Sequence, residues 1–282
     1  MKHILKHEYP NLKSADYKKA LSFIDGKYSQ YYFLDYMRCS NGNVDDAIQF
    51  SILDEKLRSL LFQNIICFEI QVKTDFAISV SKETHCSNFW KKKKFYLPDA
   101  TVSRSKGKNS KYFLVKRKIK SGINKLHFET MGPSHLVAMY TCTFGTFIQL
   151  FKYIGKNYKQ DFILKYSKNL NNRGYKIVNS YFEAIKRIRN RCAHGNHLIS
   201  KKLLYDLNNL NHVIDEQKTN NAKIVVEKTF KFMIENLYCG ENFRKELIRL
   251  FKKYKDLLSK YSKNHSIPTV FYKHSWLTTI II

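Results

Sequence analysis

An arginine and a histidine whose chemistry suits RNA cleavage lie five positions apart in the segment Ile188–Ser200 (IRNRCAHGNHLIS). Arg189 is followed by Asn190, and His194 is followed by Gly195. An imidazole, whose ordinary pKa is about 6.5, can donate and accept protons at neutral pH. A guanidinium stays charged and binds two phosphate oxygens at once. The pair therefore offers a metal-free route, in which the histidine transfers protons and the arginine stabilises charge on the phosphorane.

The spacing of this pair limits how it can act. Residues five apart on an ideal helix point about 140° away from each other. They converge only if Gly195 ends the helix and lets His194 turn, or if two copies pair across a symmetric dimer. A structural role is also open, in which Arg189 contacts an anion and His194 is favoured at a helix end by the helix dipole.

The charge of the chain points to an anionic partner. Its 282 residues include 50 Lys and Arg but only 23 Asp and Glu, which gives a formal net charge of +27 at pH 7. Such a charge repels itself unless an anion binds, and nucleic acid is the first candidate, before an acidic membrane surface. Lysine-rich coding from an AT-rich genome explains part of the lysine excess, but it does not explain the scarcity of acids.

The positive charge is concentrated between residues 91 and 125, where 13 Lys and Arg stand against one acid, Asp99. Pro98 and Gly107 interrupt any regular pattern, so residues 85–130 are predicted to form a basic, irregular insertion. Aromatic residues are interleaved and could stack on unpaired bases, or could simply pack locally. The predicted RNA-binding residues are Lys91, Lys92, Lys93, Lys94, Arg104, Lys106, Lys108, Lys111, Lys116, Arg117, Lys118 and Lys120.

The elements that must position these residues are predicted to be helices. Hydrophobic residues make up 44% of the chain, and only 10 Gly and 4 Pro interrupt it. The strongest periodicity predicts one long helix from about Asn43 to Thr84, with Asp54, Arg58, Glu69 and Lys73 on its polar face. Further helices are predicted over two stretches of 14–39, with Ser14 as a cap, and over 134–155, 158–170, 176–193, 198–213, 222–238 and 241–261.

Several classes of protein are excluded or disfavoured. The six cysteines form no CxxC pair, so neither a zinc ribbon nor another metal or cofactor site is predicted. The first residues do not read as a signal peptide, and reduced thiols fit a cytoplasmic protein. The nearly uncharged stretch 134–151 is interrupted by Thr, Cys, Gly and Gln, which favours a buried core helix over a membrane span.

Four segments, taken in order, resemble the Abi family, the AbiD/AbiF type of abortive-infection protein within the HEPN superfamily. The segment RNRCAH resembles the family's C-terminal signature, and YSQYYFLDYM (28–37) resembles its tyrosine-rich element. FSILDEKLRSLLFQNIICFEIQVKT (50–74) is similar to its "DxxLR … E" helix. HLVAMYTCTFGTFIQLFKYI (135–154) is similar to its "FGT" helix. The resemblance covers about residues 15–205.

The resemblance implies an all-α, HEPN-type helical bundle formed by residues 1–282 as a single domain, with C-terminal helices at about 222–262. It implies a homodimeric, metal-independent endoribonuclease toxin that leaves 2′,3′-cyclic phosphate and 5′-hydroxyl ends. Arg189 would stabilise the phosphorane, His194 would transfer protons, and Asn190 would orient the phosphate or the histidine. A small noncoding RNA would restrain the enzyme during anti-phage defence.

The chain departs from the family pattern just after the signature. Family members carry a second histidine and an arginine there, whereas this chain has Gly195, Asn196 and His197. We predict that His197 is a surface residue rather than a displaced second histidine. Two other functions remain open: a non-catalytic RNA-binding protein on a HEPN scaffold, and a phage-sensing protein whose basic surface meets an acidic phage factor.

Overall fold

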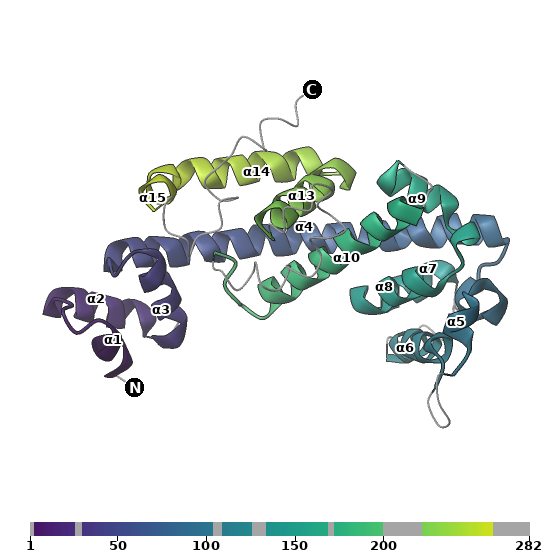
Figure 1. Ribbon diagram of the computed structural model, residues 1–282, viewed down its shortest axis with the longest axis horizontal. Coiled ribbons are helices and arrows are strands. Elements are labelled where there is room, and N and C mark those ends of the chain that lie inside the picture. Colours follow the sequence, from purple (N-terminus) through teal and green to yellow (C-terminus); the bar gives the residue numbers. More distant parts are fainter. Residues whose placement is uncertain are drawn as a thin grey trace. The chain divides into compact units, whose positions relative to one another are not determined.

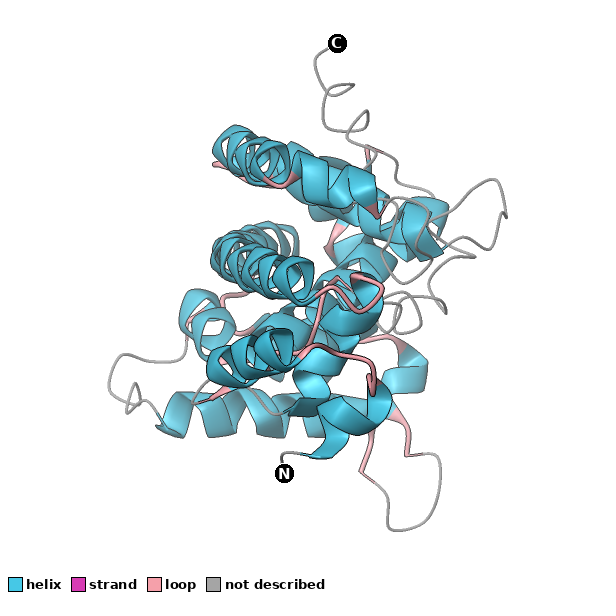
Figure 2. Ribbon diagram, turned by 90° about the vertical axis from the view of Figure 1, so that its left-hand side faces the viewer, coloured by secondary structure: helices cyan, strands magenta, loops and turns pink. Residues whose placement is uncertain are grey.

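The structure is a computed structural model that describes residues 3–25, 30–103, 109–125, 134–168, 172–199 and 222–261. Within these ranges every regular element is an α-helix or a short 3₁₀ helix, and one isolated β-bridge joins Tyr96 and Ile154. Figure 2 shows the described parts of the chain as helices joined by loops. The prediction of an all-α protein is confirmed. No described helix combines the length and the apolar character needed to cross a bilayer.

The contacts within the chain divide it into two compact units. The first unit comprises residues 1–64 and 187–282, and the second comprises residues 65–186. Two helices, α4 (Val44–Thr84) and α10 (Asn172–Ala193), each contribute one part to each unit. The expected single domain over residues 1–282 stays a prediction, and each unit is described by itself.

The first unit gathers the N-terminal and C-terminal helices (Figure 1). Besides parts of α4 and α10, it contains α1 (His3–Glu8), α2 (Ser14–Ile24), α3 (Gln30–Cys39), α13 (Ala222–Asn236), α14 (Gly240–Lys253) and α15 (Lys255–Lys260). The predicted cap at Ser14 is wrong, because Ser14 is already the first helical residue of α2 and Lys13 precedes it. The predicted helix 241–261 is divided at Tyr254 into α14 and α15.

Helix α4 confirms the strongest periodicity of the sequence. Its 41 residues begin after Asn43, whose side chain caps the helix by accepting a hydrogen bond from the Asp46 N–H at 3.0 Å. Its fully buried apolar side chains recur every three or four residues. They are Ala47, Phe50, Leu53, Leu57, Leu61, Ile65, Phe68, Val72, Phe76 and Val80, and Ala77 is fully buried beside Phe76.

The predicted polar face of α4 is partly wrong. Asp54 is completely buried, and Glu69 and Lys73 are also buried. The buried Lys73 ammonium has a partner in the second unit, because it donates to the Cys142 carbonyl at 3.0 Å. Buried charged groups need such partners. These three residues therefore belong to the interior, where periodicity alone had placed only apolar side chains.

The second unit is built around an aromatic core. Its helices besides parts of α4 and α10 are η1 (Phe89–Lys91), η2 (Lys93–Phe95), α5 (Pro98–Thr101), α6 (Lys111–Lys125), α7 (His135–Thr141), α8 (Phe144–Tyr153), η4 (Lys156–Tyr158) and α9 (Gln160–Ser167). The Phe76 ring meets the rings of Phe147 and Phe162 edge-on at centroid distances of 5.4 and 5.3 Å. The Phe182 ring lies 5.6 Å from the Phe147 ring in the same core.

The predicted irregular insertion is in part a regular helix. Helix α6 spans 15 residues and buries Val115, Ile119 and Ile123 at four-residue spacing. The dense lysines on its exposed side had obscured this apolar stripe. The predicted helix 134–155 is likewise divided into α7 and α8, because Thr143 caps α8 by accepting from the Thr146 N–H at 3.2 Å.

Some sequence predictions fall outside the described residues. Arg104, Lys106 and Lys108 of the predicted RNA-binding set lie there. Most of the predicted helix 198–213 lies there too, and its first two residues, Leu198 and Ile199, are described and are not helical.

Candidate functional site

Helix α10 ends within the segment that carries the candidate chemistry. The Gly195 N–H donates to the Cys192 carbonyl at 3.2 Å, and the Asn196 N–H donates to the Arg191 carbonyl at 2.9 Å. This pair of bonds is a Schellman motif, which requires a left-handed residue, and Gly195 has a φ of +67°. The helix thus ends at Gly195, which meets the first of the two conditions set for the pair. His194 thus occupies the cap position, where the chain leaves the helix.

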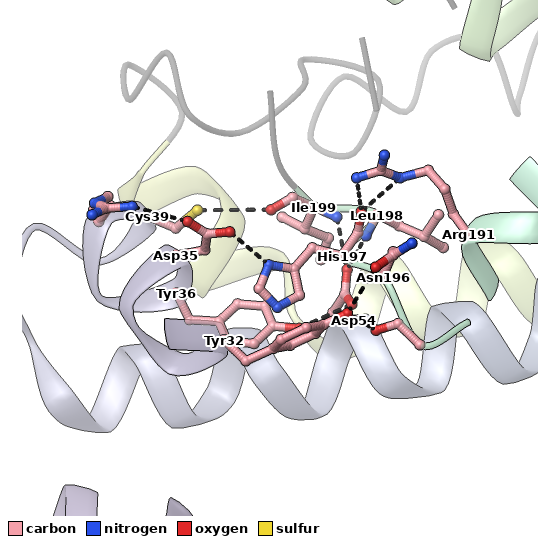
Figure 3. A network of polar contacts seen from close by, with 12 residues as sticks. Tyr32, Asp35, Tyr36, Cys39, Asp54, Arg191, Asn196, His197, Leu198 and Ile199 are labelled. Carbon is pink, nitrogen blue, oxygen red and sulfur yellow. Dashed lines mark hydrogen bonds and ion pairs between the residues drawn. The ribbon is translucent and has the colours of Figure 1, made fainter. Parts of the chain in front are cut away.

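The five residues that follow, Gly195–Ile199, form what we call the helix-end segment, and a buried carboxylate holds its far end. Asp54 of α4 accepts hydrogen bonds through Oδ1 from the backbone N–H groups of Leu198 at 2.8 Å and Ile199 at 2.7 Å. Its Oδ2 accepts from the Tyr36 hydroxyl at 3.0 Å and from Arg58 Nη1 at 2.7 Å. Figure 3 shows the Asp54 and Tyr36 side chains beside Leu198 and Ile199 of this segment. The Asp54 carboxylate therefore binds the backbone N–H groups that a helix or strand would otherwise bind.

Three further side chains bind carbonyl oxygens of the helix-end segment. Arg58 Nη1 and the Tyr32 hydroxyl both donate to the Gly195 carbonyl, at 3.1 and 2.6 Å. Arg191 donates through Nε and Nη2 to the His197 carbonyl, at 3.1 and 3.0 Å. We call Tyr32, Tyr36, Asp54, Arg58 and Arg191 the Asp54 network. It binds donors and acceptors at both ends of the segment, so the backbone just after His194 is fixed.

The prediction that His197 is a surface residue is wrong. Its side chain is only 4% exposed, and its Nδ1 lies 3.1 Å from Asp35 Oδ2. Its ring contacts the rings of Tyr32 and Tyr36 at centroid distances of 4.2 and 4.4 Å. The imidazole therefore points inward and lies among side chains of α3 (Figure 3). Buried in this way, His197 positions the segment and is not placed to touch an RNA substrate.

Burial raises the pKa of two neutral groups, Tyr36 of the Asp54 network and Cys192 beside it. It raises the pKa of the Tyr36 hydroxyl, and the adjacent Asp54 carboxylate raises it further. Burial also raises the pKa of the Cys192 thiol to about 12, with the Asp54 charge adding to the effect. The hydroxyl therefore remains a hydrogen-bond donor, and the thiol remains protonated and is not a nucleophile.

The residues predicted to do chemistry are more accessible than those that position them. Arg189 is half-buried, with its guanidinium carbon 5.8 Å from the centre of the Phe62 ring and its Nη1 3.5 Å from Asn190 Oδ1. Asn190 and His194 are exposed. Among the described residues, no hydrogen bond joins the Arg189 guanidinium to the His194 imidazole. One chain therefore brings Arg189 and Asn190 together, and leaves His194 on the surface at the helix end.

The predicted RNA-binding cations lie in the second unit. Lys92, Lys93, Lys94, Arg117, Lys118 and Lys120 are exposed, whereas Lys91, Lys111 and Lys116 are half-buried. The aromatic residues beside them do not form a stacking surface, because Phe89, Trp90, Phe95 and Tyr96 are buried. The exposed Phe113 and the half-buried Tyr112 remain at the surface. The local-packing interpretation of these rings is correct for the four buried ones.

Sequence reasoning did not find the Asp54 network. Asp54 and Leu198 are 144 positions apart, and a single sequence does not reveal that they meet. One signal was present: Asp54 lies next to Leu53 on a helix whose buried side chains surround it, where a charged residue needs a partner. Among the described residues, no three His, Cys, Asp or Glu side chains gather as they would around a metal ion.

Comparison with known proteins adds one finding. A family model described as an Abi-like protein matches residues 14–200, or 187 of the 282 residues. The matched range includes the whole Asp54 network, the helix-end segment and the Arg189–His194 pair. Neither the curated proteins nor the solved structures include a match to the chain.

Proposed function

Because this chain belongs to the Abi-like protein family, which associates it with abortive-infection defence, we propose that it is a metal-independent endoribonuclease of the HEPN type. The observation that carries the proposal is the fixed helix end. A buried carboxylate 144 positions away in the sequence, Asp54, holds the backbone that follows His194. A loop with no function beyond connection would not need this many buried polar contacts, which are costly unless all are satisfied.

The proposed reaction is an internal transfer at one phosphodiester. The ribose 2′-oxygen attacks phosphorus, the bond from phosphorus to the 5′-oxygen breaks, and the products are a 2′,3′-cyclic phosphate and a 5′-hydroxyl. The 2′-hydroxyl proton is removed by a base, and the departing 5′-oxygen receives a proton. The exposed His194 imidazole supplies this proton transfer. Arg189 binds the phosphorane oxygens, and Asn190 beside it orients the phosphate.

A homodimer completes this site in the proposal. Within one chain Arg189 lies on the helix and His194 lies past its last turn, and the two make no hydrogen bond with each other in the described structure. A two-fold axis beside α10 would pair each motif with a second copy, and would supply one base and one acid to a single phosphate. The basic residues of the second unit bind the rest of the RNA, whether it is the substrate or a small noncoding RNA that restrains the enzyme.

The central test compares cleavage with binding. Purified His194→Ala and Arg189→Ala proteins are expected to lose about 100-fold or more in the rate of RNA cleavage while they keep RNA affinity. Arg189→Lys, which retains the charge without the planar fork, is expected to lose most of this activity as well. Wild-type cleavage is expected to persist in EDTA.

The alternative is a non-catalytic RNA-binding protein, which the separation of Arg189 from His194 in one chain favours. Under that alternative the wild-type protein binds RNA and leaves it intact. Cleavage at the wild-type rate by His194→Ala protein, or inhibition by EDTA, contradicts the proposed mechanism. Mixing Arg189→Ala with His194→Ala chains tests the dimer. The heterodimer keeps one intact Arg189 and one intact His194 on different chains, so it regains part of the activity only if those two residues act at one site.

A further inference from the structure

The second unit contains a cavity whose lining includes two of the predicted RNA-binding residues, Arg117 and Lys118. It has a volume of about 560 Å³ and lies where α6 meets the end of α7 and the start of α8. Three cations from one side of α6 line it, namely Arg117, Lys118 and Lys125. Hydroxyl groups line it as well, from Ser121 on α6 and from Thr143 and Thr146 at the start of α8. The lining therefore combines positive charge with hydroxyl donors on short side chains.

Within the described residues, no acid neutralises the positive charge of this cavity. Residues 109–125 and 134–153, which include all of α6, α7 and α8, contain no Asp or Glu. Among the described residues, none of Arg117, Lys118 and Lys125 forms an ion pair, and Lys118 donates to the uncharged Gln149 side chain at 3.2 Å. Clustered cations without acids raise the free energy of the folded protein unless an anion binds.

The neighbouring face of α6 has the same character. Burial lowers the pKa of Lys91, and the charges of Lys116, Lys120 and Lys92 lower it further. Cations therefore repel one another on this face of the helix too. The cavity therefore belongs to a helix with exposed cations on more than one side.

The start of α8 adds a second kind of anion-binding group to the cavity. Thr143 caps this ten-residue helix, and its Oγ1 lies 3.0 Å from Thr146 Oγ1. The positive end of a helix dipole favours an anion there.

The floor of the cavity is formed by backbone in close contact. A Cβ at Gly122 would lie 2.7 Å from the Thr141 carbonyl oxygen, so only glycine lets α6 approach the end of α7 this closely. Both residues line the cavity. A cavity whose wall is a helix–helix contact exists before a ligand arrives, and binding then costs little reorganisation.

We propose that this cavity binds a backbone phosphate of single-stranded RNA. The guanidinium of Arg117 and the ammonium groups of Lys118 and Lys125 contact the non-bridging oxygens, and the hydroxyls of Ser121 and Thr143 donate to them. A pocket for one phosphate fixes the register of the strand without reading its sequence. The choice of RNA as the ligand rests on the proposed function, whereas the phosphate chemistry rests on the cavity alone.

The test measures the affinity of a labelled 20-nucleotide single-stranded RNA at several salt concentrations, by fluorescence anisotropy, in the His194→Ala background. The test variant is Lys118→Gln/Lys125→Gln. We expect its affinity to fall about tenfold, and the slope of log affinity against log salt to decrease by about 1.4, or 0.7 for each lost phosphate contact. Ser121→Ala, which changes no charge, is expected to lower affinity by about threefold with the slope unchanged.

A matched control is Lys252→Gln/Lys255→Gln, which removes two exposed lysines from α14 and α15 in the first unit. We expect it to change the RNA affinity by less than about twofold. Equal losses in the test and control variants overturn the proposal, because charge alone then explains binding. If the test variant loses affinity for phosphatidylserine vesicles but not for RNA, the occupant is a lipid headgroup and the proposal is also overturned.

Two measurements together separate this inference from the proposed function: the cleavage of a trinucleotide by wild-type protein, and the RNA affinity of the Lys118→Gln/Lys125→Gln variant. If wild-type protein cleaves RNA and the Lys118→Gln/Lys125→Gln variant keeps full RNA affinity, the cavity proposal is overturned and the endoribonuclease stands. If wild-type protein cleaves no RNA while the same variant selectively loses RNA affinity, the cavity proposal is supported and the endoribonuclease is overturned.

Discussion

The helix-end segment and the residue pair just before it differ in how the protein holds them. The segment's backbone is bound by buried and half-buried side chains from α3, α4 and α10, with the fully buried Asp54 at the centre. Arg189, Asn190 and His194 lie on the same helix or at its end, but their side chains are half-buried or exposed. The protein therefore uses its buried polar groups to position the backbone and leaves the reactive groups accessible. Substitutions in the two regions should separate stability from activity.

The largest effect on stability is expected from Asp54→Ala. The change removes all four hydrogen bonds of the carboxylate. It also leaves the Arg58 guanidinium, whose side chain is 11% exposed, without its ion-pair partner. Breaking a buried pair of this kind typically costs about 3–5 kcal/mol. Urea denaturation measures the loss. Asp45→Ala, which removes an exposed acid from the start of the same helix, should cost less than about 1 kcal/mol.

An intermediate effect is expected from Gly195→Ala. A Cβ at this position meets no atom within 4 Å, so the cost is the left-handed backbone alone, about 1–2 kcal/mol. Gly195→Asn is the matched control, because asparagine adopts this conformation more readily and should lose less. Thermal denaturation of the two variants compares them. Equal stability of Gly195→Ala and wild type would mean that the helix does not need this left-handed residue.

A smaller effect is expected from Tyr36→Phe. The variant keeps the ring that packs against His197 and loses only the hydroxyl that donates to Asp54 at 3.0 Å. Three hydrogen bonds to the carboxylate remain, so the loss should be about 1 kcal/mol. Chemical denaturation of this variant alone and combined with Asp54→Ala tests the coupling. If the two losses simply add, the hydroxyl and the carboxylate do not act together.

The smallest effect on stability is expected from His194→Ala, although its effect on cleavage is expected to be large. The imidazole is exposed, and truncating an exposed side chain outside the core usually changes stability by less than about 0.5 kcal/mol. Denaturation and RNA-cleavage rates are measured on the same preparation. A large loss of stability in this variant would place His194 in the same class as the Asp54 network and would erase the distinction between the two regions.

The sequence predicted what depends on local periodicity. Helix α4 was found because its apolar residues recur over 41 positions, and the end of α10 was found because Gly195 follows a polar helix end. Helix α6 was missed because the lysines on its exposed side outnumber the three buried residues that make it a helix in the folded unit. Local signals therefore failed where a short apolar stripe is covered by charge.

What could not be predicted depends on contacts between distant residues. Nothing near His197 in the sequence indicates that Asp35, Tyr32 and Tyr36 enclose it, so a polar turn appeared to be a surface feature. The candidate pair Arg189 and His194 could be named from its chemistry, yet its geometry depends on Asp54, which is 144 positions from Leu198. Residue types identify a possible reaction, whereas the fold decides which groups are held in place.

The bonding of the Asp54 carboxylate to two consecutive peptide groups has a consequence for amide exchange. The N–H groups of Leu198 and Ile199 lie outside any helix, and such amides usually exchange rapidly with solvent deuterium. Here each donates to a buried oxygen, so both should exchange as slowly as amides in the middle of α4. Slow exchange at these two positions would then report the state of an interaction between distant parts of the chain. Any ligand or partner that opens the helix-end segment would be detected first as faster deuterium uptake there.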